Sequence, residues 1–219
     1  MKQYVSMVPK GHPNRPGLKL EALKAIVVHY TGNEHPTMTD TANVRWISRS
    51  YVNKGSKIYE TDGVTPFRFG SAHVFFDMDS MTMALPLDEV AWGVGDRSHN
   101  KGFMPIAHSI FKQRQNYCTL SVEICNNDVV RNSTVDWDTA VINAREWIIN
   151  HLIRIKTGID LEGSLNPQKA VTIEKGKVLL LRHFDITGKN CPAHFVKHKA
   201  EWETFVRYVA EKVNEGSYE

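Results

Sequence analysis

The chain has 219 residues, of which 42% are hydrophobic and 23% charged, and its net charge is +3. This composition is typical of a globular protein, and we expect residues 1–219 to form one domain with a hydrophobic core of its own. The charge is too small for the strongly basic surface that nucleic-acid binding needs, so we expect no nucleic-acid partner. The sequence shows neither an apolar run of membrane-spanning length nor a secretory signal, so we expect synthesis in the cytoplasm and no membrane insertion.

The chain has three cysteines, Cys118, Cys125 and Cys191, and this odd number argues against a framework of disulfide bonds. Cys118 and Cys125 are an odd number of residues apart, so on one straight strand they would face opposite sides and could not pair. We interpret these two cysteines as small buried apolar residues.

The first predicted elements follow an N-terminal arm. Residues 1–20 are expected to be extended, because residues 9–17 are rich in proline and glycine. Residues 25–29 predict a buried strand, since four apolar residues there lead to a histidine. A helix is expected from Thr39 or Asp40 to about residue 51. Residues 53–70 are expected to be a loop.

Strands are then predicted at residues 71–77, 81–85 and 120–125. In the last of these, Val122 and Ile124 lie on one side, so Glu123 is expected on the opposite face. Residues 97–115, which are mostly polar, and residues 159–177 are interpreted as insertions.

The clearest helix is predicted over residues 136–157, where apolar residues recur at helical spacing and Gly158 is expected to end the helix. A strand at 178–181 and a C-terminal helix at 202–213 complete the pattern. This order of elements predicts a mixed α/β fold in which helices cover a central sheet.

Residues 182–192 carry an imidazole, an ammonium and a thiol on His183, Lys189 and Cys191. Histidine nitrogen and cysteine sulfur both bind zinc, and a catalytic zinc site combines three protein ligands with water. Two ligands are too few, and His29, at the end of the first predicted strand, is the best candidate for a third. We therefore expect one Zn²⁺ ion held by His29, His183 and Cys191, with a fourth position open.

Six segments, spread in order along the chain, carry a family resemblance. They are PKG and NRPG within residues 9–17, VVHYTGN at 27–33, SAHV at 71–74, LPL and VAW within 85–92, LSVEICN at 120–126, and residues 182–192. Together they resemble the zinc-dependent N-acetylmuramoyl-L-alanine amidases that share the fold of peptidoglycan recognition proteins. Within that family the chain looks most like the phage and prophage endolysins.

The resemblance implies hydrolysis of the amide between N-acetylmuramic acid and L-alanine in peptidoglycan, by a protein with a central mixed sheet flanked by helices. We expect this protein to be a monomer. It implies zinc binding by the three residues named above, and catalytic roles for Glu123 and Lys189. Such a protein would reach the cell wall after release or export by another factor. The bacterial host and the preferred stem peptide are left open.

Each proposed role competes with a simpler interpretation. Glu123 could act as general base and acid, or be a solvated strand residue. Lys189 could stabilise an oxyanion, or be a surface lysine. His73 could orient a ligand or be a buried strand histidine, and Trp92 could line a groove or pack in the core. The remaining histidines considered are expected to be solvated: His35, His99, His108, His151, His194 and His198.

Three departures from the family pattern bear on these roles. Gly93, Val94 and Gly95 follow Trp92 where the family commonly has histidine, alanine and glycine. Ala72 stands where some members have a tyrosine, which leaves its role to Glu123. The two predicted insertions look longer than usual.

Three other functions remain possible at this point. A non-catalytic peptidoglycan-binding protein of the same fold would characteristically lack Cys191. A cytosolic wall-recycling amidase often has aspartate at that position. A zinc-stabilised structural domain would unfold without its metal.

Overall fold

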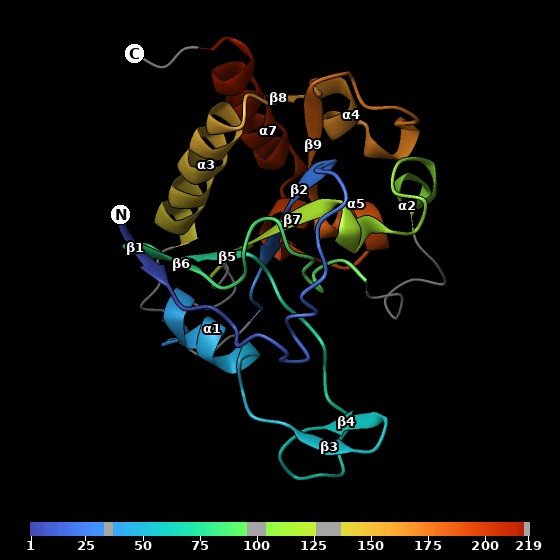
Figure 1. Cartoon of the computed structure of the whole chain (residues 1–219). Helices are drawn as coiled ribbons and strands as arrows, with labels where there is room; N and C mark the ends of the chain where they lie inside the picture. Colours follow the sequence, from blue (N-terminus) through green and yellow to red (C-terminus); the bar gives the residue numbers. More distant parts are fainter. Residues whose placement is uncertain (33–36, 96–103, 126–136, 217–219) are drawn as a thin grey trace.

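The computed structural model describes residues 1–32, 37–95, 104–125 and 137–216 (Figure 1). Its centre is a seven-stranded sheet with the order β1-β6-β5-β7-β2-β9-β8. Neighbouring strands are parallel except for β5 and β6, which are antiparallel. The strands are β1 (Lys2–Val5), β2 (Ala25–Tyr30), β5 (Val74–Phe76), β6 (Ser80–Met83), β7 (Thr119–Ile124), β8 (Gly158–Ile159) and β9 (Lys177–Arg182).

Helices cover both faces of this sheet, as the sequence predicts. Three are long: α1 (Asp40–Ile47), α3 (Trp137–Arg154) and α7 (Lys199–Asn214). The short ones are α2 (Pro105–Ser109), α4 (Leu161–Leu165), α5 (His183–Thr187) and α6 (Ala193–Lys197), with 3-10 turns at Gln115–Tyr117 and Pro167–Lys169. Among the described helices, none combines the length and the apolarity needed to cross a membrane.

Alternation along the central strands divides the core in two. Ile26 and Val28 of β2 pack with Val122 and Ile124 of β7 against α3 and α7. The intervening positions of β2 and β9 face the other side, where they form a second cluster with α2 and Ile186 of α5. Because Glu123 alternates with Val122 and Ile124, its side chain belongs to this second face, as predicted.

Several predicted elements are confirmed. The strand at 25–29 is β2, the strand at 120–125 is β7, and the strand at 178–181 is β9, each within one or two residues. The C-terminal helix buries the predicted apolar face of α7, and Cys118 and Cys125 are free and buried. The helix predicted from residue 136 is described from Trp137, and residue 136 itself lies outside the described residues.

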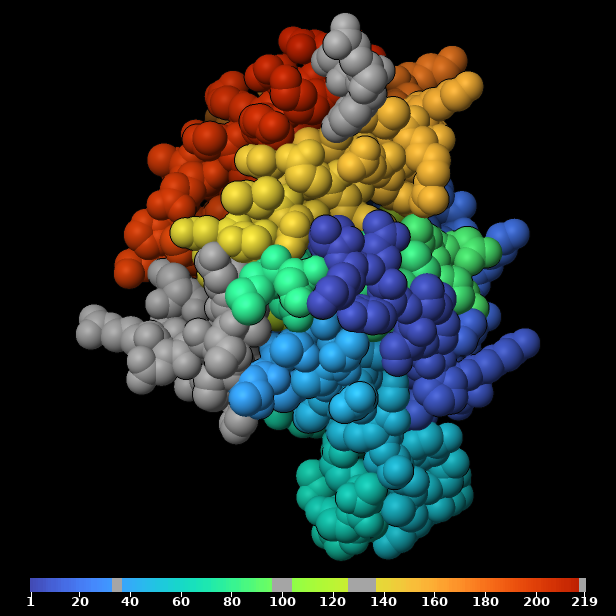
Figure 2. All heavy atoms as spheres, turned by 90° about the vertical axis from the view of Figure 1, so that its left-hand side faces the viewer, coloured from blue at the N-terminus to red at the C-terminus, as the bar shows by residue number. Residues whose placement is uncertain are grey.

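Residues 53–70 are not a simple loop, and this prediction was wrong. They contain most of an antiparallel hairpin of β3 (Val52–Lys54) and β4 (Lys57–Tyr59), whose turn places Gly55 at φ +66°. The hairpin projects beyond α1 at the lower end of the molecule (Figure 2). The helix expected to reach residue 51 ends at Ile47, just before this hairpin begins.

The structure adds detail to two other expectations and contradicts a third. Residues 2–5 form β1 and pair with β6, so the N-terminal arm contributes an edge strand. In the first predicted insertion, residues 104–115 bury Ile106 and Phe111 in the second cluster, while residues 97–103 lie outside the described part. Gly158 begins β8 and does not end α3, because the helix already stops at Arg154.

Candidate functional site

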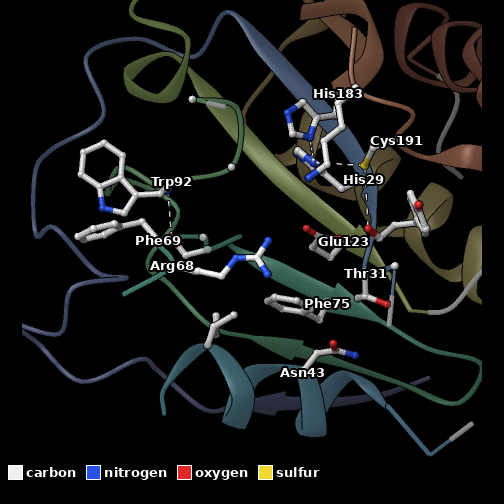
Figure 3. Close-up of a pocket in the computed structure, with 18 of the residues that line it drawn as sticks. His29, Thr31, Asn43, Arg68, Phe69, Phe75, Trp92, Glu123, His183 and Cys191 are labelled. Carbon is white, nitrogen blue, oxygen red and sulfur yellow. Dashed lines mark hydrogen bonds between the residues drawn. The ribbon is translucent and has the colours of Figure 1, made fainter. Parts of the chain in front are cut away.

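Three side chains from distant segments meet at one end of an open pocket (Figure 3). His29 Nδ1 lies 3.1 Å from His183 Nδ1 and 3.9 Å from Cys191 Sγ. All three residues are buried, and their candidate ligand atoms lie within 4.8 Å of one another. These are the residues that the sequence predicts as partners around one metal ion.

The strand register explains why the two histidines meet. Val28 of β2 pairs with Arg182 of β9. His29 directly follows Val28, and His183 directly follows Arg182. Parallel neighbours end at the same edge of a sheet, so both imidazoles are delivered to that edge. His183 is the first residue of α5, which begins where β9 ends.

A buried ion pair fixes the start of α5. The Asp185 carboxylate accepts hydrogen bonds from the Arg182 backbone N–H at 2.8 Å and from its guanidinium at 2.7 and 3.1 Å. The Phe184 N–H donates to the Cys191 carbonyl at 2.9 Å, which ties the cysteine segment to the same helix. Asp185 thus shapes the turn that presents His183 and Cys191, as expected for a residue that caps a helix.

The spacing of the three donors suits a single metal ion. With zinc–nitrogen bonds of about 2.0 Å and zinc–sulfur bonds of about 2.3 Å, ligand atoms of a tetrahedral site lie roughly 3.3–3.6 Å apart. The observed separations of 3.1 and 3.9 Å bracket that range. His29 Nε2 is also buried without a hydrogen-bond partner among the described residues.

Without a metal ion, the electrostatics of the site keep two of the candidate ligands, His29 and Cys191, uncharged. Burial, followed by the nearby His183 and Lys189, lowers the pKa of His29 well below its usual value, so this imidazole is neutral and can act as a ligand. Burial also raises the pKa of the Cys191 thiol, and the Glu123 charge adds to this effect. A cation bound between them would favour the thiolate.

Glu123 lies beside His29, because the two residues pair across β7 and β2. It is half-buried, and its Oε2 atom has no hydrogen-bond partner in the described part of the chain. Burial raises the pKa of Glu123 to about 8, although the Lys189 ammonium lowers it in part. Lys189 is half-buried on the pocket wall, where its charge reaches both Glu123 and His29.

The pocket has a volume of about 1210 Å³ and extends away from the three candidate ligands. Glu123 and Lys189 line it near those ligands. Figure 3 shows Phe69 and Trp92 at the opposite end, and the Arg68 side chain between Phe69 and Glu123. The sequence interpretation did not single out Arg68 or Phe69, because their segment showed no pattern beyond that of a loop.

The structure also decides between the alternatives for two aromatic residues. His73 is fully buried; its Nδ1 accepts from the Ser121 N–H at 2.9 Å, so its Nε2 donates to the Glu89 carbonyl, also at 2.9 Å. It therefore holds β5 in place and does not line the pocket among the described residues. Trp92 lines the pocket, although its indole N–H donates to the Pro13 carbonyl at 3.2 Å.

The other histidines are only partly as expected. His151 is buried and stacks on Trp147 with ring centroids 5.0 Å apart, so the prediction that it is solvated was wrong. His194 lies 2.6 Å from Glu201, while His108 is exposed and His198 is half-buried. His35 and His99 lie outside the described residues.

Comparison with known proteins gives one family. Residues 19–194 match the family model described as N-acetylmuramoyl-L-alanine amidase. The N-acetylmuramoyl-L-alanine amidase BlyA of Bacillus subtilis (strain 168) is 26% identical over 211 residues, which are 95% of this chain and 47% of BlyA. The chain thus spans about half the length of the curated relatives that it matches.

Solved structures show the same fold. The catalytic domain of XlyA superimposes with a TM-score of 0.61 at 20% identity, covering 94% of this chain and 99% of that domain. A mutant endolysin from Bacillus subtilis gives a TM-score of 0.62 at 20% identity, covering 95% of this chain and 99% of the endolysin. With the family match over most of the sequence, these findings show that the chain belongs to the N-acetylmuramoyl-L-alanine amidase family.

Proposed function

We propose that this protein is a zinc-dependent amidase that cleaves the bond between N-acetylmuramic acid and L-alanine in peptidoglycan. The observation that carries the proposal is the meeting of His29, His183 and Cys191 beside Glu123 at one end of an open pocket. Membership of the family supports the bond that is cleaved. The two imidazoles, the thiol and the spacing of the donor atoms support zinc as the metal.

Zinc, when bound, would supply Lewis acidity, which polarises the amide carbonyl and lowers the pKa of a water molecule. The three ligands would hold the ion at one end of the pocket. The rest of the pocket is open, which leaves room for a substrate to approach from one side.

Glu123 is the proposed general base and acid. Its carboxyl group faces the ligands and has a pKa of about 8, close enough to neutrality to accept a proton and then return it. It would take a proton from the attacking water and deliver it to the departing amino group of L-alanine. Ala72, at the position of the family's tyrosine, is buried and has no hydroxyl group, so it cannot take this role.

Lys189 is proposed to stabilise the charge that develops on the carbonyl oxygen. Its ammonium group makes no hydrogen bond or ion pair within the described residues, and it lines the pocket beside Glu123. A cation already fixed near the reacting carbonyl stabilises the transition state without reorganising, which is the most effective form of electrostatic catalysis.

The remaining parts of the proposal concern the whole protein. We propose a phage or prophage endolysin that acts as a monomer on the cell wall after release or export by another factor. The resemblance of its segments to that subgroup supports this role, as does the likeness of its fold to a mutant endolysin from Bacillus subtilis. Residues 1–219 are proposed to be one catalytic domain, since one seven-stranded sheet takes its strands from residues 2 to 182.

Mass spectrometry of digested peptidoglycan tests the reaction. Purified cell walls are incubated with the protein as isolated, with a chelator, and with the chelator followed by zinc. We expect peptides with a new amino-terminal L-alanine, loss of this product with the chelator, and its return with zinc. A zinc-loaded, folded protein that binds cell walls but releases no such peptide would be a binding protein, and the amidase proposal would be wrong.

The folded state without metal gives a second readout. The core clusters lie mostly outside the ligand site, so we expect the chelated protein to keep its near-ultraviolet circular dichroism while it loses activity. Cooperative unfolding on chelation would instead indicate a zinc-stabilised structural domain. Cys191→Ala, which removes one donor from the buried site, should behave like the chelated wild type.

A further inference from the structure

The N-terminal arm, residues 8–17, passes the end of α1 on its way from β1 to β2 (Figure 1). None of its residues belongs to the described lining of the pocket. The arm nevertheless contacts three segments that do line it, which are α1, residues 68–71, and Trp92. Figure 3 shows Phe69 and Trp92 at the end of the pocket opposite the candidate metal ligands.

The arm is firmly attached to the body of the protein. The Arg15 guanidinium donates to both carboxylate oxygens of Glu89, at 2.8 and 2.7 Å, and to the Val8 carbonyl at 3.0 Å. The Val8 N–H donates to the Ala84 carbonyl at 2.9 Å, directly after β6. The Val8 side chain is fully buried and packs in one cluster with Val44 of α1. These contacts make the arm a fixed support for the segments that it touches.

The Asn14 side chain joins two walls of the pocket. It is fully buried, and its Nδ2 donates to the carbonyl of Ile47, the last residue of α1, at 2.8 Å. Its Oδ1 accepts from the Gly70 N–H at 3.0 Å. The last carbonyl groups of a helix have no partner within the helix, so this amide also caps the end of α1. Ile47 and Gly70 both line the pocket, on separate segments of the chain.

The two residues before Asn14 act in the same direction. His12 Nδ1 accepts from the Asn14 N–H at 3.1 Å, so its Nε2 donates to the Arg49 carbonyl, at 2.8 Å, just beyond α1. The Pro13 carbonyl accepts from the Trp92 indole N–H at 3.2 Å. Three consecutive residues of the arm thus hold the end of α1, residues 68–71 and Trp92 in fixed relative positions.

We propose that Asn14 is a positioning residue that fixes the separation between α1 and residues 68–71, and with it the fit of substrate groups remote from the cleaved bond. This inference rests on the proposed function. Asn14 lies outside the described lining, so it acts through the two walls and not by touching the substrate. Without its amide, the Ile47 carbonyl and the Gly70 N–H lose a buried partner, and the walls must shift to find another.

The effect should depend on the length of the substrate. The proposed catalytic side chains, Glu123 and Lys189, lie on β7 and after α5, and the arm forms no hydrogen bond with either. A fragment that ends near the candidate metal ligands does not need both walls, whereas a longer fragment reaches Phe69 and Trp92. Asn14 should therefore control KM for long substrates and leave kcat unchanged.

The test measures steady-state kinetics of the zinc-loaded protein on two soluble substrates. One is the shortest muramyl peptide that the wild type cleaves, and the other is a wall fragment extended in both glycan and peptide. For Asn14→Ala, we expect KM for the long fragment to rise about tenfold. KM for the short peptide and both kcat values should stay within about twofold of wild type. Assays are run well below the unfolding temperature of each variant, so that every sample is folded.

Asn214→Ala is the matched control. Asn214, near the end of α7, likewise donates to a carbonyl and accepts from an N–H, both of Ile159, at 2.9 and 2.8 Å, and it does not line the pocket. We expect its KM values to match those of wild type. Amide hydrogen exchange checks each substitution, since exchange should quicken at Gly70 in Asn14→Ala and at Ile159 in Asn214→Ala.

A second variant keeps the inference testable if Asn14→Ala does not fold. His12→Phe keeps a ring against Tyr51 and Phe67 and removes the donor to the Arg49 carbonyl. It should raise KM for the long fragment alone, by about threefold.

The outcomes separate this inference from the proposed function. Equal rises in KM on both substrates, a loss confined to kcat, or the same effect from Asn214→Ala would overturn the positioning role of Asn14. If the wild type cleaves neither substrate, the amidase proposal fails, and calorimetric binding of the same two fragments decides the role of Asn14. Weaker binding of the long fragment alone by Asn14→Ala would support that role, and any other binding result would refute it.

Discussion

His29 and Glu123 occupy paired positions on neighbouring parallel strands, so a candidate metal ligand and a candidate proton-transfer group face the same side of the sheet. On the other side of β2, Val28 pairs with Arg182 of β9, and His183 directly follows Arg182. Three adjacent strands thus place three reactive side chains at one edge. The arrangement depends on backbone register, which hydrophobic cores on both faces hold in place.

The first prediction concerns turnover by Glu123→Gln. The amide is similar in size to the carboxyl group and cannot transfer the proton, so we expect kcat to fall roughly 10²–10⁴-fold. Zinc content and the unfolding transition should stay close to those of wild type. Steady-state kinetics on a soluble muramyl peptide, with metal analysis of the same samples, provides the measurement. Turnover within a few-fold of wild type would remove Glu123 from the mechanism.

The same substitution predicts a change in how stability depends on pH without metal. Burial raises the pKa of Glu123 from 4.5 to about 8 in the folded protein, so the folded state binds more protons than the unfolded state between those values. Stability therefore falls as pH rises from about 4.5 to 8, by a total on the order of a few kcal/mol, and the loss levels off above pH 8. Glu123→Gln should lack this contribution.

Urea unfolding of the chelated proteins at several pH values measures this effect. The free energy of unfolding of wild type minus that of Glu123→Gln should decrease as pH rises through this window. Titrations that both proteins share, such as that of Asp40, cancel in the difference. A difference that stays constant with pH would show that the carboxyl group is not buried as the structure describes.

Lys189→Ala should lower kcat and leave KM nearly unchanged. An ammonium group aimed at a developing oxyanion acts mainly in the transition state, and its loss is expected to cost about 3 kcal/mol, or roughly 10²-fold in rate. Lys189→Arg, which keeps a positive charge, should retain part of the activity. A rise in KM at normal kcat would assign Lys189 to substrate binding and exclude the oxyanion role.

Gly93→Ala is predicted to destabilise the protein through contact with β7. A Cβ atom at Gly93 would overlap the buried Ser121 side chain, so the strand or the loop would have to shift. Overpacking of this kind costs about 1–3 kcal/mol. The crowding also explains why a bulkier residue, such as the family's common histidine, is not accommodated next to Trp92 here.

Gly70→Ala is the matched control for that prediction. Gly70 also lines the pocket, and a Cβ atom there would meet nothing within 4 Å. Chemical denaturation of the two variants and wild type should show a loss only for Gly93→Ala. Equal stability of both variants would mean that Ser121 moves aside without cost.

The sequence predicted the elements with a clear apolar pattern. β2 and β9 are continuous apolar runs that are buried on both faces of the sheet. α7 has apolar residues at helical spacing, because one of its faces packs against the core. The hairpin of β3 and β4 was missed, since it projects from the body and buries too few residues to show alternation. The helix over residues 105–109 was missed because a polar composition concealed Ile106, which packs against α5 and β9.

By itself, the sequence determined the mixed α/β order, the side of β7 that Glu123 faces, and which three residues have the chemistry to share a metal ion. Local periodicity and side-chain chemistry are sufficient for these conclusions. Only the tertiary structure decided that the three donors lie close enough together to bind one ion, that His73 is buried with both ring nitrogens hydrogen-bonded, and that Arg68 points into the pocket. Those facts depend on strand register and on packing between segments that are far apart in the chain, and local sequence patterns do not determine either.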